Sequence, residues 1–271
     1  MTESSRRSEG PLRTAIELAR TTLEVEPSGL LTDFDGTLSP IVEDPLLARL
    51  ADGADGALAA LTSRLAVVAI ITGRAAADVR RMAGVPGLLI VGNHGVEWLE
   101  PEDDEPAPGA DATDIERRLD SALEPVPTPP GVVVERKGLS ATIHYRNAAD
   151  PNGTRTVIVR ALRGASTHGL DVREGRMSVE LRPRGLGDKG AAARAIVERH
   201  RLRGVVVMGD DLTDLDMFTA VAELRGAGVL RAAIIAVGAG DDEAPSQVRE
   251  AADVILRDPA EAALLLAALS R

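Results

Sequence analysis

The chain contains no cysteine among its 271 residues. This excludes disulfide bonds, thiolate nucleophiles and cysteine-based zinc sites, but it leaves the cellular compartment open. Aromatic residues are nearly absent, with one Trp, one Tyr and two Phe. A stacking platform for single-stranded nucleic acid, which depends on aromatic side chains, is therefore not expected. The core must be aliphatic, and 44% hydrophobic residues suffice for a large domain plus a smaller one.

Positive charge is also in short supply, with 31 Lys and Arg against 42 Asp and Glu, a formal net charge of −11. A protein this acidic does not bind nucleic acid or anionic membranes through bulk charge. No apolar stretch follows the basic pair near the N-terminus, and no run reaches the length of a membrane span. We therefore expect a cytoplasmic protein without nucleic-acid or membrane partners.

Short apolar runs that stop at small or polar residues recur along the chain. They cover residues 29–32, 65–71, 88–91, 204–208 and 233–237, and helices are expected at residues 12–23, 54–64, 75–82 and 262–269. Parallel strands buried on both faces read as continuous apolar runs. The pattern predicts an α/β fold, a Rossmann-like doubly wound parallel sheet with functional groups at the carboxyl ends of its strands.

The middle of the chain follows a different pattern. An acidic, Pro-rich linker at 101–109 precedes helices expected at 111–123 and 154–163 and strands expected at 132–135, 139–145 and 176–182. The first two of these strands are close enough to form a hairpin. We predict an inserted α+β domain at residues 102–184, within a discontinuous core of residues 1–101 and 185–271. Hinges near residues 101–110 and 183–187 would make the inserted domain mobile.

Two carboxylates follow the first apolar run, in the segment DFDGT at residues 33–37. A carboxylate at a strand end is placed to attack a phosphorus atom in line. A second one nearby can donate a proton to the leaving oxygen and later take one from water. We predict these roles for Asp33 and Asp35. A turn that only caps a helix is the alternative for this segment taken alone.

A hydroxyl and a lysine suited to a phosphoryl group lie further along the chain. Thr72 follows the run at 65–71, and ordinary helix capping is its alternative role. Lys189 opens an alanine-rich helix, where the helix dipole disfavours a cation unless an anion lies nearby. A solvated surface lysine is the alternative there.

Three acids, Asp210, Asp211 and Asp214, follow the run at 204–208. Carboxylates this close repel one another unless a cation lies among them, and helix capping explains one or two of them more easily than three. A nucleophilic Asp, a hydroxyl, a lysine and an acidic cluster, in this order, form a set far more specific than its members. The set resembles the haloacid dehalogenase (HAD) superfamily of phosphohydrolases, in which the second Asp of the first motif is the acid/base.

Within that superfamily, the chain resembles the trehalose-6-phosphate phosphatases. The matching segments are LTDFDGTLSPIVEDP (31–45), TGR (72–74), GNHGVE (92–97), VERKGLS (134–140), HYR (144–146), ELRP (180–183), DKG (188–190) and GDDLTD (209–214). They lie in both predicted domains. The family often has Ser in place of Thr72, which keeps the hydroxyl. It often has Leu in place of Asn93, which makes Asn93 an additional candidate for a sugar contact.

The resemblance implies a Mg²⁺-dependent phosphatase that hydrolyses trehalose 6-phosphate through an aspartyl phosphate on Asp33, with Asp35 as acid/base and Thr72 and Lys189 on the phosphoryl oxygens. The implied metal site comprises Asp33, the backbone carbonyl of Asp35, and Asp210, with Asp211 or Asp214 in support. The implied substrate contacts are Gly73, Arg74, His94, Glu135, Lys137, Arg146, Glu180 and Arg182. For the contacts in the inserted domain, surface strand positions or a charged hairpin turn are the alternatives.

Other functions remain open on the sequence. The same chemistry suits sucrose phosphate, glucosyl-3-phosphoglycerate or mannosyl-3-phosphoglycerate. A non-catalytic sugar-phosphate sensor is a second alternative, against which the complete motif set argues. A response-regulator-like phosphoacceptor is a third, and Asp35 and the inserted domain argue against it. The sequence leaves open a functional link to a trehalose-6-phosphate synthase.

Overall fold

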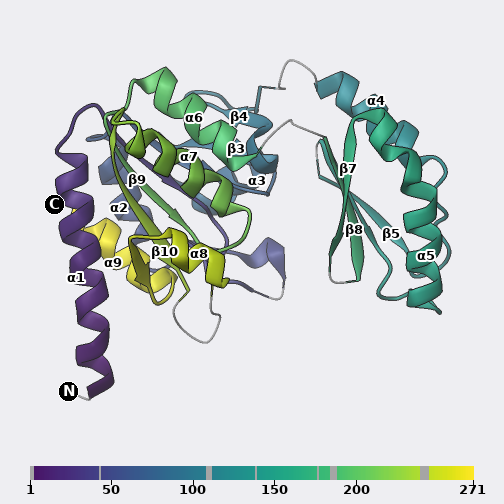
Figure 1. Ribbon diagram of the computed structural model, residues 1–271, viewed down its shortest axis with the longest axis horizontal. Coiled ribbons are helices and arrows are strands. Elements are labelled where there is room, and N and C mark those ends of the chain that lie inside the picture. Colours follow the sequence, from purple (N-terminus) through teal and green to yellow (C-terminus); the bar gives the residue numbers. More distant parts are fainter. Residues whose placement is uncertain are drawn as a thin grey trace. The chain divides into compact units, whose positions relative to one another are not determined.

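The computed structural model describes residues 3–42, 44–107, 112–137, 139–175, 177–183, 188–238 and 244–271, without the side chains of residues 3–9, 112, 113 and 137. The chain divides into two compact units, a core of Met1–Pro106 with Asp188–Arg271 and an inserted unit of Ala107–Gly187 (Figure 1). The domain boundaries expected at 101/102 and 184/185 lie a few residues before the observed boundaries at 106/107 and 187/188. Residues 184–187 lie outside the described part.

The core is built on a seven-stranded sheet in the order β11-β10-β9-β1-β2-β3-β4. Its strands are β1 (Ser28–Thr32), β2 (Val67–Ile71), β3 (Leu89–Gly92), β4 (Glu97–Leu99), β9 (Gly204–Gly209), β10 (Arg231–Val237) and β11 (Val254–Leu256). All neighbours pair in parallel except β3 and β4. The strand order reverses between β1 and β9, and such a switch point opens a crevice at the carboxyl ends of the strands. The predicted doubly wound sheet is confirmed.

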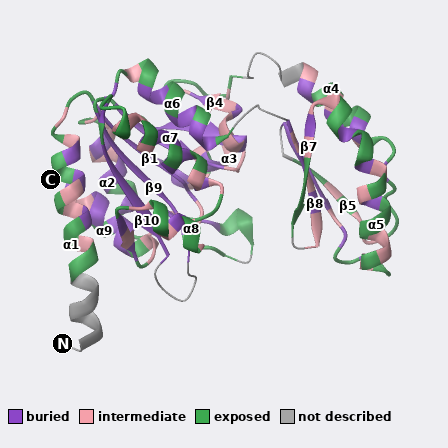
Figure 2. Ribbon diagram, viewed as in Figure 1, coloured by how far each residue is buried: buried purple, intermediate pink, exposed green. Residues whose placement is uncertain are grey.

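Helices cover both faces of the core sheet. One face packs on α1 (Glu3–Leu23), α2 (Ala54–Thr62), α3 (Ala76–Ala83) and α9 (Pro259–Leu269), and the other on α6 (Lys189–His200), α7 (Asp214–Gly226) and α8 (Ser246–Ala251). Successive strand residues point to opposite faces, so Leu30 joins the first cluster and Leu31 the second. Strands β1, β2, β3 and β9 are therefore buried at every position, as β1 and β9 show in Figure 2. This burial is why apolar runs mark these strands in the sequence.

The inserted unit holds a four-stranded antiparallel sheet in the order β5-β6-β8-β7. Its elements are α4 (Ala112–Leu123), β5 (Val133–Lys137), β6 (Ser140–His144), α5 (Pro151–Ala161), η3 (Leu162–His168), β7 (Leu170–Gly175) and β8 (Ser178–Pro183). The expected pairing of β5 with β6 is confirmed. Ala141 and Ile143 of β6 are buried, as are Val179 and Leu181 of β8, and the register places all four on one face of the sheet.

Several elements were not predicted from the sequence. Strands β4 and β11 have three residues each, too few to form a pattern. Strand β7 lies at the edge of its sheet and buries only Leu170, so it lacks an apolar signature. Helix α1 begins at Glu3 rather than near residue 12, and Pro11 lies inside it. None of the described helices has the length and apolar character needed to cross a membrane.

Candidate active site

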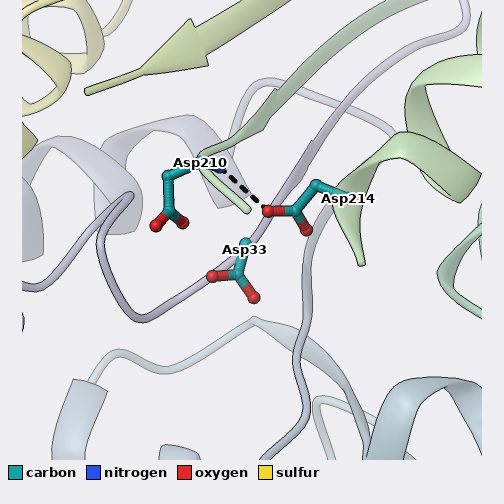
Figure 3. A group of neighbouring side chains, drawn as sticks. All are labelled: Asp33, Asp210 and Asp214. Atoms are coloured by element: carbon teal, nitrogen blue, oxygen red, sulfur yellow. Dashed lines mark hydrogen bonds between the residues drawn. The ribbon is translucent and has the colours of Figure 1, made fainter. Parts of the chain in front are cut away.

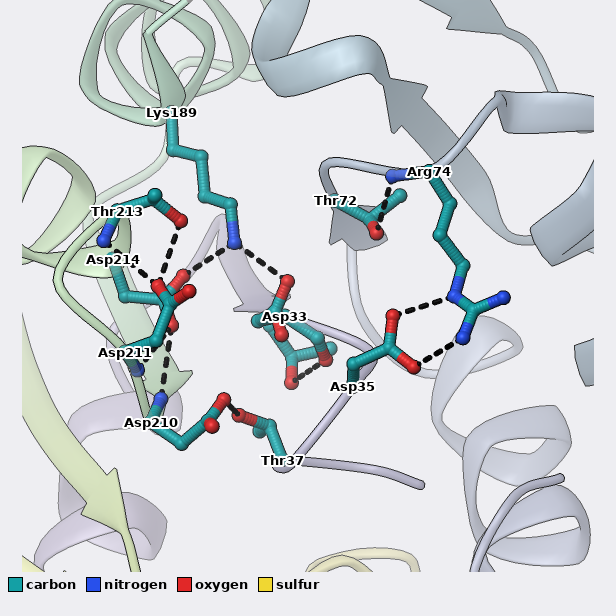
Figure 4. Close-up of polar contacts among 11 residues, drawn as sticks. Asp33, Asp35, Thr37, Thr72, Arg74, Lys189, Asp210, Asp211, Thr213 and Asp214 are labelled. Carbon is teal, nitrogen blue, oxygen red and sulfur yellow. Dashed lines mark hydrogen bonds and ion pairs between the residues drawn. The ribbon is translucent and has the colours of Figure 1, made fainter. Parts of the chain in front are cut away.

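Asp33 follows β1 directly at the switch point of the core sheet. Its backbone N–H donates to the carbonyl of Met208 in β9 at 3.0 Å, which ties the ends of the two strands together. Its side chain is buried, and Oδ1 accepts a hydrogen bond of 2.6 Å from Nζ of Lys189 (Figure 4). The sheet therefore presents a buried, oriented carboxylate at the end of its central strand.

Lys189 is the first residue of α6 and is only 2% exposed, so the alternative of a solvated surface lysine is wrong. Its ammonium lies 2.6 Å from Oδ1 of Asp33 and 2.6 Å from Oδ1 of Asp214. Burial lowers the pKa of Lys189, but the attraction of the two carboxylates outweighs it and raises the pKa above its ordinary value. Lys189 therefore carries a fixed positive charge into the site.

Asp33, Asp210 and Asp214 form an acidic group, with one oxygen from each within 4.8 Å of the others (Figure 3). Burial raises the pKa of Asp33 and of Asp214, and Lys189 only partly opposes it. Burial and the charge of Asp214 raise the pKa of Asp210 to about 7. Three carboxylates against one ammonium leave an excess of negative charge, so the group is compatible with a bound metal ion.

The members of the acidic group differ in how far their oxygens are already engaged. Both oxygens of Asp214 are used, because Oδ1 accepts from Lys189 and Oδ2 from the N–H groups of Asp210 at 2.9 Å and Asp211 at 3.1 Å. Asp214 therefore orients the group rather than offering a free oxygen. Asp211 lies outside the group, since its Oδ1 accepts from both N and Oγ1 of Thr213 at 2.7 Å. Its part in metal binding stays a prediction.

The turn after Asp35 forms a cradle for Asp210. Gly36 has φ of +76°, and a Cβ there would lie 2.0 Å from Oδ2 of Asp210. Thr37 donates from Oγ1 to Oδ1 of the same carboxylate at 2.9 Å. Only glycine allows this approach, so the turn places Asp210 against the backbone that follows Asp35.

Thr72 stands at the end of β2, next to β1, and is 1% exposed. Its Oγ1 accepts the N–H of Arg74 at 3.1 Å and keeps its own proton to donate. The helix-capping alternative for Thr72 is wrong, because α3 begins at Ala76, whose N–H donates to Oε2 of Glu97 at 3.0 Å. Thr72 is thus a buried hydroxyl on the strand beside the one that ends at Asp33.

The loop after β3 closes over the loop after β2. His94 has φ of 59° and donates its N–H to the carbonyl of Thr72 at 2.9 Å. A Cβ on Gly73 would lie 2.7 Å from Cε1 of His94, so the imidazole occupies space that only glycine leaves open. Asn93 is 4% exposed, and its Nδ2 donates to Oε1 of Glu97 at 2.5 Å. Asn93 is therefore held inside the loop, away from the exposed position expected of a sugar contact.

Asp35 and Arg74 form an ion pair through both carboxylate oxygens. Nε of Arg74 lies 2.5 Å from Oδ2 of Asp35, and Nη2 donates to Oδ1 at 2.7 Å (Figure 4). The hydrogen bond to Asp35 raises the pKa of Arg74 above its ordinary value. Both residues were predicted from the sequence to belong to the site, but their pairing was not.

Two structural members of the site were missed by sequence analysis. Glu97 bridges Asn93 and the first turn of α3, and Thr213 holds Asp211. Both lie inside quoted motifs. A Glu four residues after Asn93, and a Thr two residues after an Asp, are local signals from which these roles were open to prediction.

The inserted unit brings several predicted sugar contacts onto one face of its sheet. Glu135 stands opposite Thr142, Thr142 opposite Glu180, and Glu180 opposite Arg173. Residues paired in this way share a face. Oε2 of Glu135 also lies 2.8 Å from Nε2 of His144. This row is polar across all four strands.

A second row of polar residues crosses the same strands two residues away from the first row, so it lies on the same face of the sheet. Arg182 stands opposite Asp171, two residues beyond Glu180. Lys137 stands opposite Ser140 in the backbone register, and its side chain lies outside the described part. Arg146 lies just beyond β6 and is exposed. Two rows of one face thus carry four of the five substrate contacts expected in this unit.

The chain is similar in sequence and in fold to known proteins. The sequence model of the trehalose-phosphatase family matches residues 31–251. The trehalose-phosphate phosphatase of Mycobacterium avium (strain 104) is 42% identical over 202 residues, which cover 70% of this chain and 50% of that protein. The chain thus spans about half the length of this curated relative. The C-terminal domain of the C. albicans trehalose-6-phosphate phosphatase has a TM-score of 0.71 at 26% identity, with 94% of this chain and 96% of that one covered.

A more distant likeness concerns the fold alone. A haloacid dehalogenase-like hydrolase from Bacteroides thetaiotaomicron has a TM-score of 0.60 at 15% identity, with 89% of this chain and 98% of that one covered. The HAD-like architecture predicted from the motifs is therefore confirmed. Asp33, Thr72, Lys189 and Asp210 all lie within the stretch that the family model matches. The chain belongs to the trehalose-phosphatase family.

Proposed function

We propose that the protein is a Mg²⁺-dependent phosphatase that hydrolyses trehalose 6-phosphate to trehalose and phosphate. One observation carries the proposal: a buried Asp33 at the end of the central strand, held by Lys189 beside Asp210 and Asp214. The names of the M. avium and C. albicans relatives support the substrate.

In the proposed first step, Asp33 attacks the phosphorus atom, and the bond between phosphorus and the sugar 6-oxygen breaks. Asp35 gives its proton to that oxygen, and trehalose leaves. In the second step, water attacks the phosphorus of the aspartyl phosphate and yields a proton to Asp35. The bond to Asp33 breaks, and phosphate leaves. Lys189 and the hydroxyl of Thr72 hold the phosphoryl oxygens throughout.

The residues present fit a magnesium ion. Asp33 and Asp210 retain carboxylate oxygens for a cation, the carbonyl of Asp35 precedes the turn that cradles Asp210, and Asp214 orients the group. Magnesium prefers oxygen ligands of this kind. When bound, it would offset the local carboxylates and draw negative charge from the phosphoryl group.

The polar face of the inserted unit is the proposed source of sugar recognition. Glu135, Glu180, Lys137 and Arg182 on this face, with Arg146 just beyond β6, would supply carboxylates and cationic donors, which suit the hydroxyl groups of a disaccharide. His94 is proposed as a further contact from the core. Arg74 was also expected to contact the substrate, but its guanidinium is paired with both oxygens of Asp35.

A substrate panel tests the proposal. Phosphate release would be measured with Mg²⁺ from trehalose 6-phosphate, sucrose phosphate, glucosyl- and mannosyl-3-phosphoglycerate and glucose 6-phosphate. We expect trehalose 6-phosphate to be hydrolysed fastest. Preference for another sugar phosphate would overturn the substrate but keep the chemistry. No release from any of them would support the sensor alternative.

Magnesium is expected to raise the melting temperature more at pH 8 than at pH 6. The pKa of Asp210 is raised from 3.8 to about 7 by burial and by Asp214. In the metal-free protein, this proton-bound form contributes stability below pH 3.8 that is lost as the pH rises through about 7. A cation needs the carboxylate form, so protons compete with it at pH 6. Thermal unfolding with and without Mg²⁺ at both pH values measures the effect, and equal increments would contradict it.

Glu180→Gln is expected to lower kcat/KM for trehalose 6-phosphate about 10-fold, because a charged hydrogen bond to a sugar hydroxyl is weakened. For p-nitrophenyl phosphate, which has no sugar, kcat/KM should stay within about twofold. Glu174→Gln is the matched control, since Glu174 alternates with Arg173 onto the opposite face of the same sheet and pairs with Arg155. Equal losses in both variants would remove this face from sugar recognition.

A further inference from the structure

The guanidinium of Arg74 is already engaged at three of its nitrogen atoms. Nε and Nη2 bind the two oxygens of Asp35 at 2.5 and 2.7 Å (Figure 4). Nη1 donates to the carbonyl of Pro45 at 2.7 Å. The guanidinium carbon also lies 5.9 Å from the centre of the Phe34 ring. A guanidinium engaged in this way has few N–H groups left to donate to a phosphoryl group or a sugar.

The backbone of Arg74 is held as firmly as its side chain. Its N–H donates to Oγ1 of Thr72 at 3.1 Å, and its carbonyl accepts from the N–H of Asn93 at 2.8 Å. The side chain is 19% exposed, compared with 37% for that of Asp35. Arg74, the more buried residue of the pair, is thus fixed by hydrogen bonds to the loops after β2 and β3, and it holds the more exposed Asp35 in place.

Asp35 lies at the start of a tight turn, where Arg74 is the residue that holds its carboxylate. The next residue, Gly36, has φ of +76°, and both oxygens of the Asp35 carboxylate accept hydrogen bonds from Arg74. An aspartate without this partner is free to rotate about its Cα–Cβ bond into solvent. A proton-transferring group must stay within hydrogen-bond reach of the reacting oxygen.

We propose that Arg74 is a positioning residue that holds Asp35 in place for proton transfer, rather than a contact for the substrate. The inference rests on the proposed function, because it gives Asp35 the acid/base role. Arginine suits this task and lysine does not, since only a planar fork binds both carboxylate oxygens and the carbonyl of Pro45 at once.

The test compares two leaving groups. Loss of Arg74 should slow substrates whose leaving oxygen needs a proton and should spare those whose leaving group departs as an anion. In Arg74→Gln, we expect kcat/KM for trehalose 6-phosphate to fall about 10- to 100-fold. For p-nitrophenyl phosphate, kcat/KM should fall less than about threefold, because it reports only the steps up to release of p-nitrophenolate. Arg74→Lys should show the same pattern if Arg74→Gln folds poorly.

A double variant separates positioning from direct binding. If Arg74 acts only through Asp35, Arg74→Gln in an Asp35→Ala background should cost no further activity on trehalose 6-phosphate. Arg81→Gln is the matched control, since Arg81 is 69% exposed and pairs with Asp78 on the surface of α3. It should behave as the native protein with both substrates.

Each other outcome overturns the inference. Equal losses on both substrates, losses that multiply in the double variant, or no loss in Arg74→Gln would each show that Arg74 does not act by positioning Asp35. Failure of the proposed function is recognised separately, because the native protein would then release phosphate from neither substrate, and the inference would fall with it.

Discussion

Asp33→Asn is expected to abolish phosphate release without weakening the fold. The substitution removes the nucleophile, which should lower kcat by about 1,000-fold or more and eliminate any phosphorylated protein. Burial raises the pKa of Asp33 well above 3.8, so its ionised form is costly in the metal-free protein. A neutral isostere removes that cost. The melting temperature without Mg²⁺ should therefore stay the same or rise.

Steady-state phosphate release, acid-quench trapping of labelled protein and thermal unfolding measure these three quantities. Asp52→Asn is the matched control, since Asp52 is an exposed loop residue, and it should leave all three unchanged. An active Asp33→Asn variant, or labelled protein that still forms in it, would end the aspartyl-phosphate mechanism. A large loss of stability would contradict the electrostatic account of the acidic group.

Lys189→Met is expected to remove both activity and much of the stability at neutral pH. Lys189 is 2% exposed, and its ammonium lies 2.6 Å from Asp33 and from Asp214. Removing one partner of a buried ion pair leaves uncompensated charge, which typically costs about 3–5 kcal/mol. The free energy of unfolding, from urea titration without Mg²⁺ at pH 8, should fall by this order. The loss should shrink as the pH is lowered, since the raised pKa values of Asp33 and Asp214 allow those carboxylates to become neutral.

A second-site change separates the two roles of Lys189. Asp214→Asn in the Lys189→Met background removes one of the stranded charges, so it should restore part of the stability and none of the activity. Arg194→Met, on the surface of α6 and paired with Glu223, is the matched control and should cost no more than about 1 kcal/mol. A Lys189→Met protein as stable as the native chain would show that the lysine is not needed to balance this group.

The core architecture was predictable because its strands are buried on both faces. Such strands are buried at every position and carry apolar runs, as in β2 and β9 and in the centre of β1, so they stand out without any alignment. Edge strands were not predictable in this way. β7 exposes most of its residues, and β4 and β11 are three residues long, so their existence depends on the neighbours with which they pair.

The sequence by itself determined the chemical groups and their order, because motifs such as DFDGT and GDDLTD are contiguous and follow recognisable strands. Only the tertiary structure decided which groups meet. Lys189 and Asp33 are 156 positions apart and Arg74 and Asp35 are 39 apart, yet each pair is in direct contact. Asp214, and not its neighbour Asp211, joins the acidic group. The physical reason is that strand order and helix packing set the distances between side chains at a sheet edge, and no local pattern contains that information.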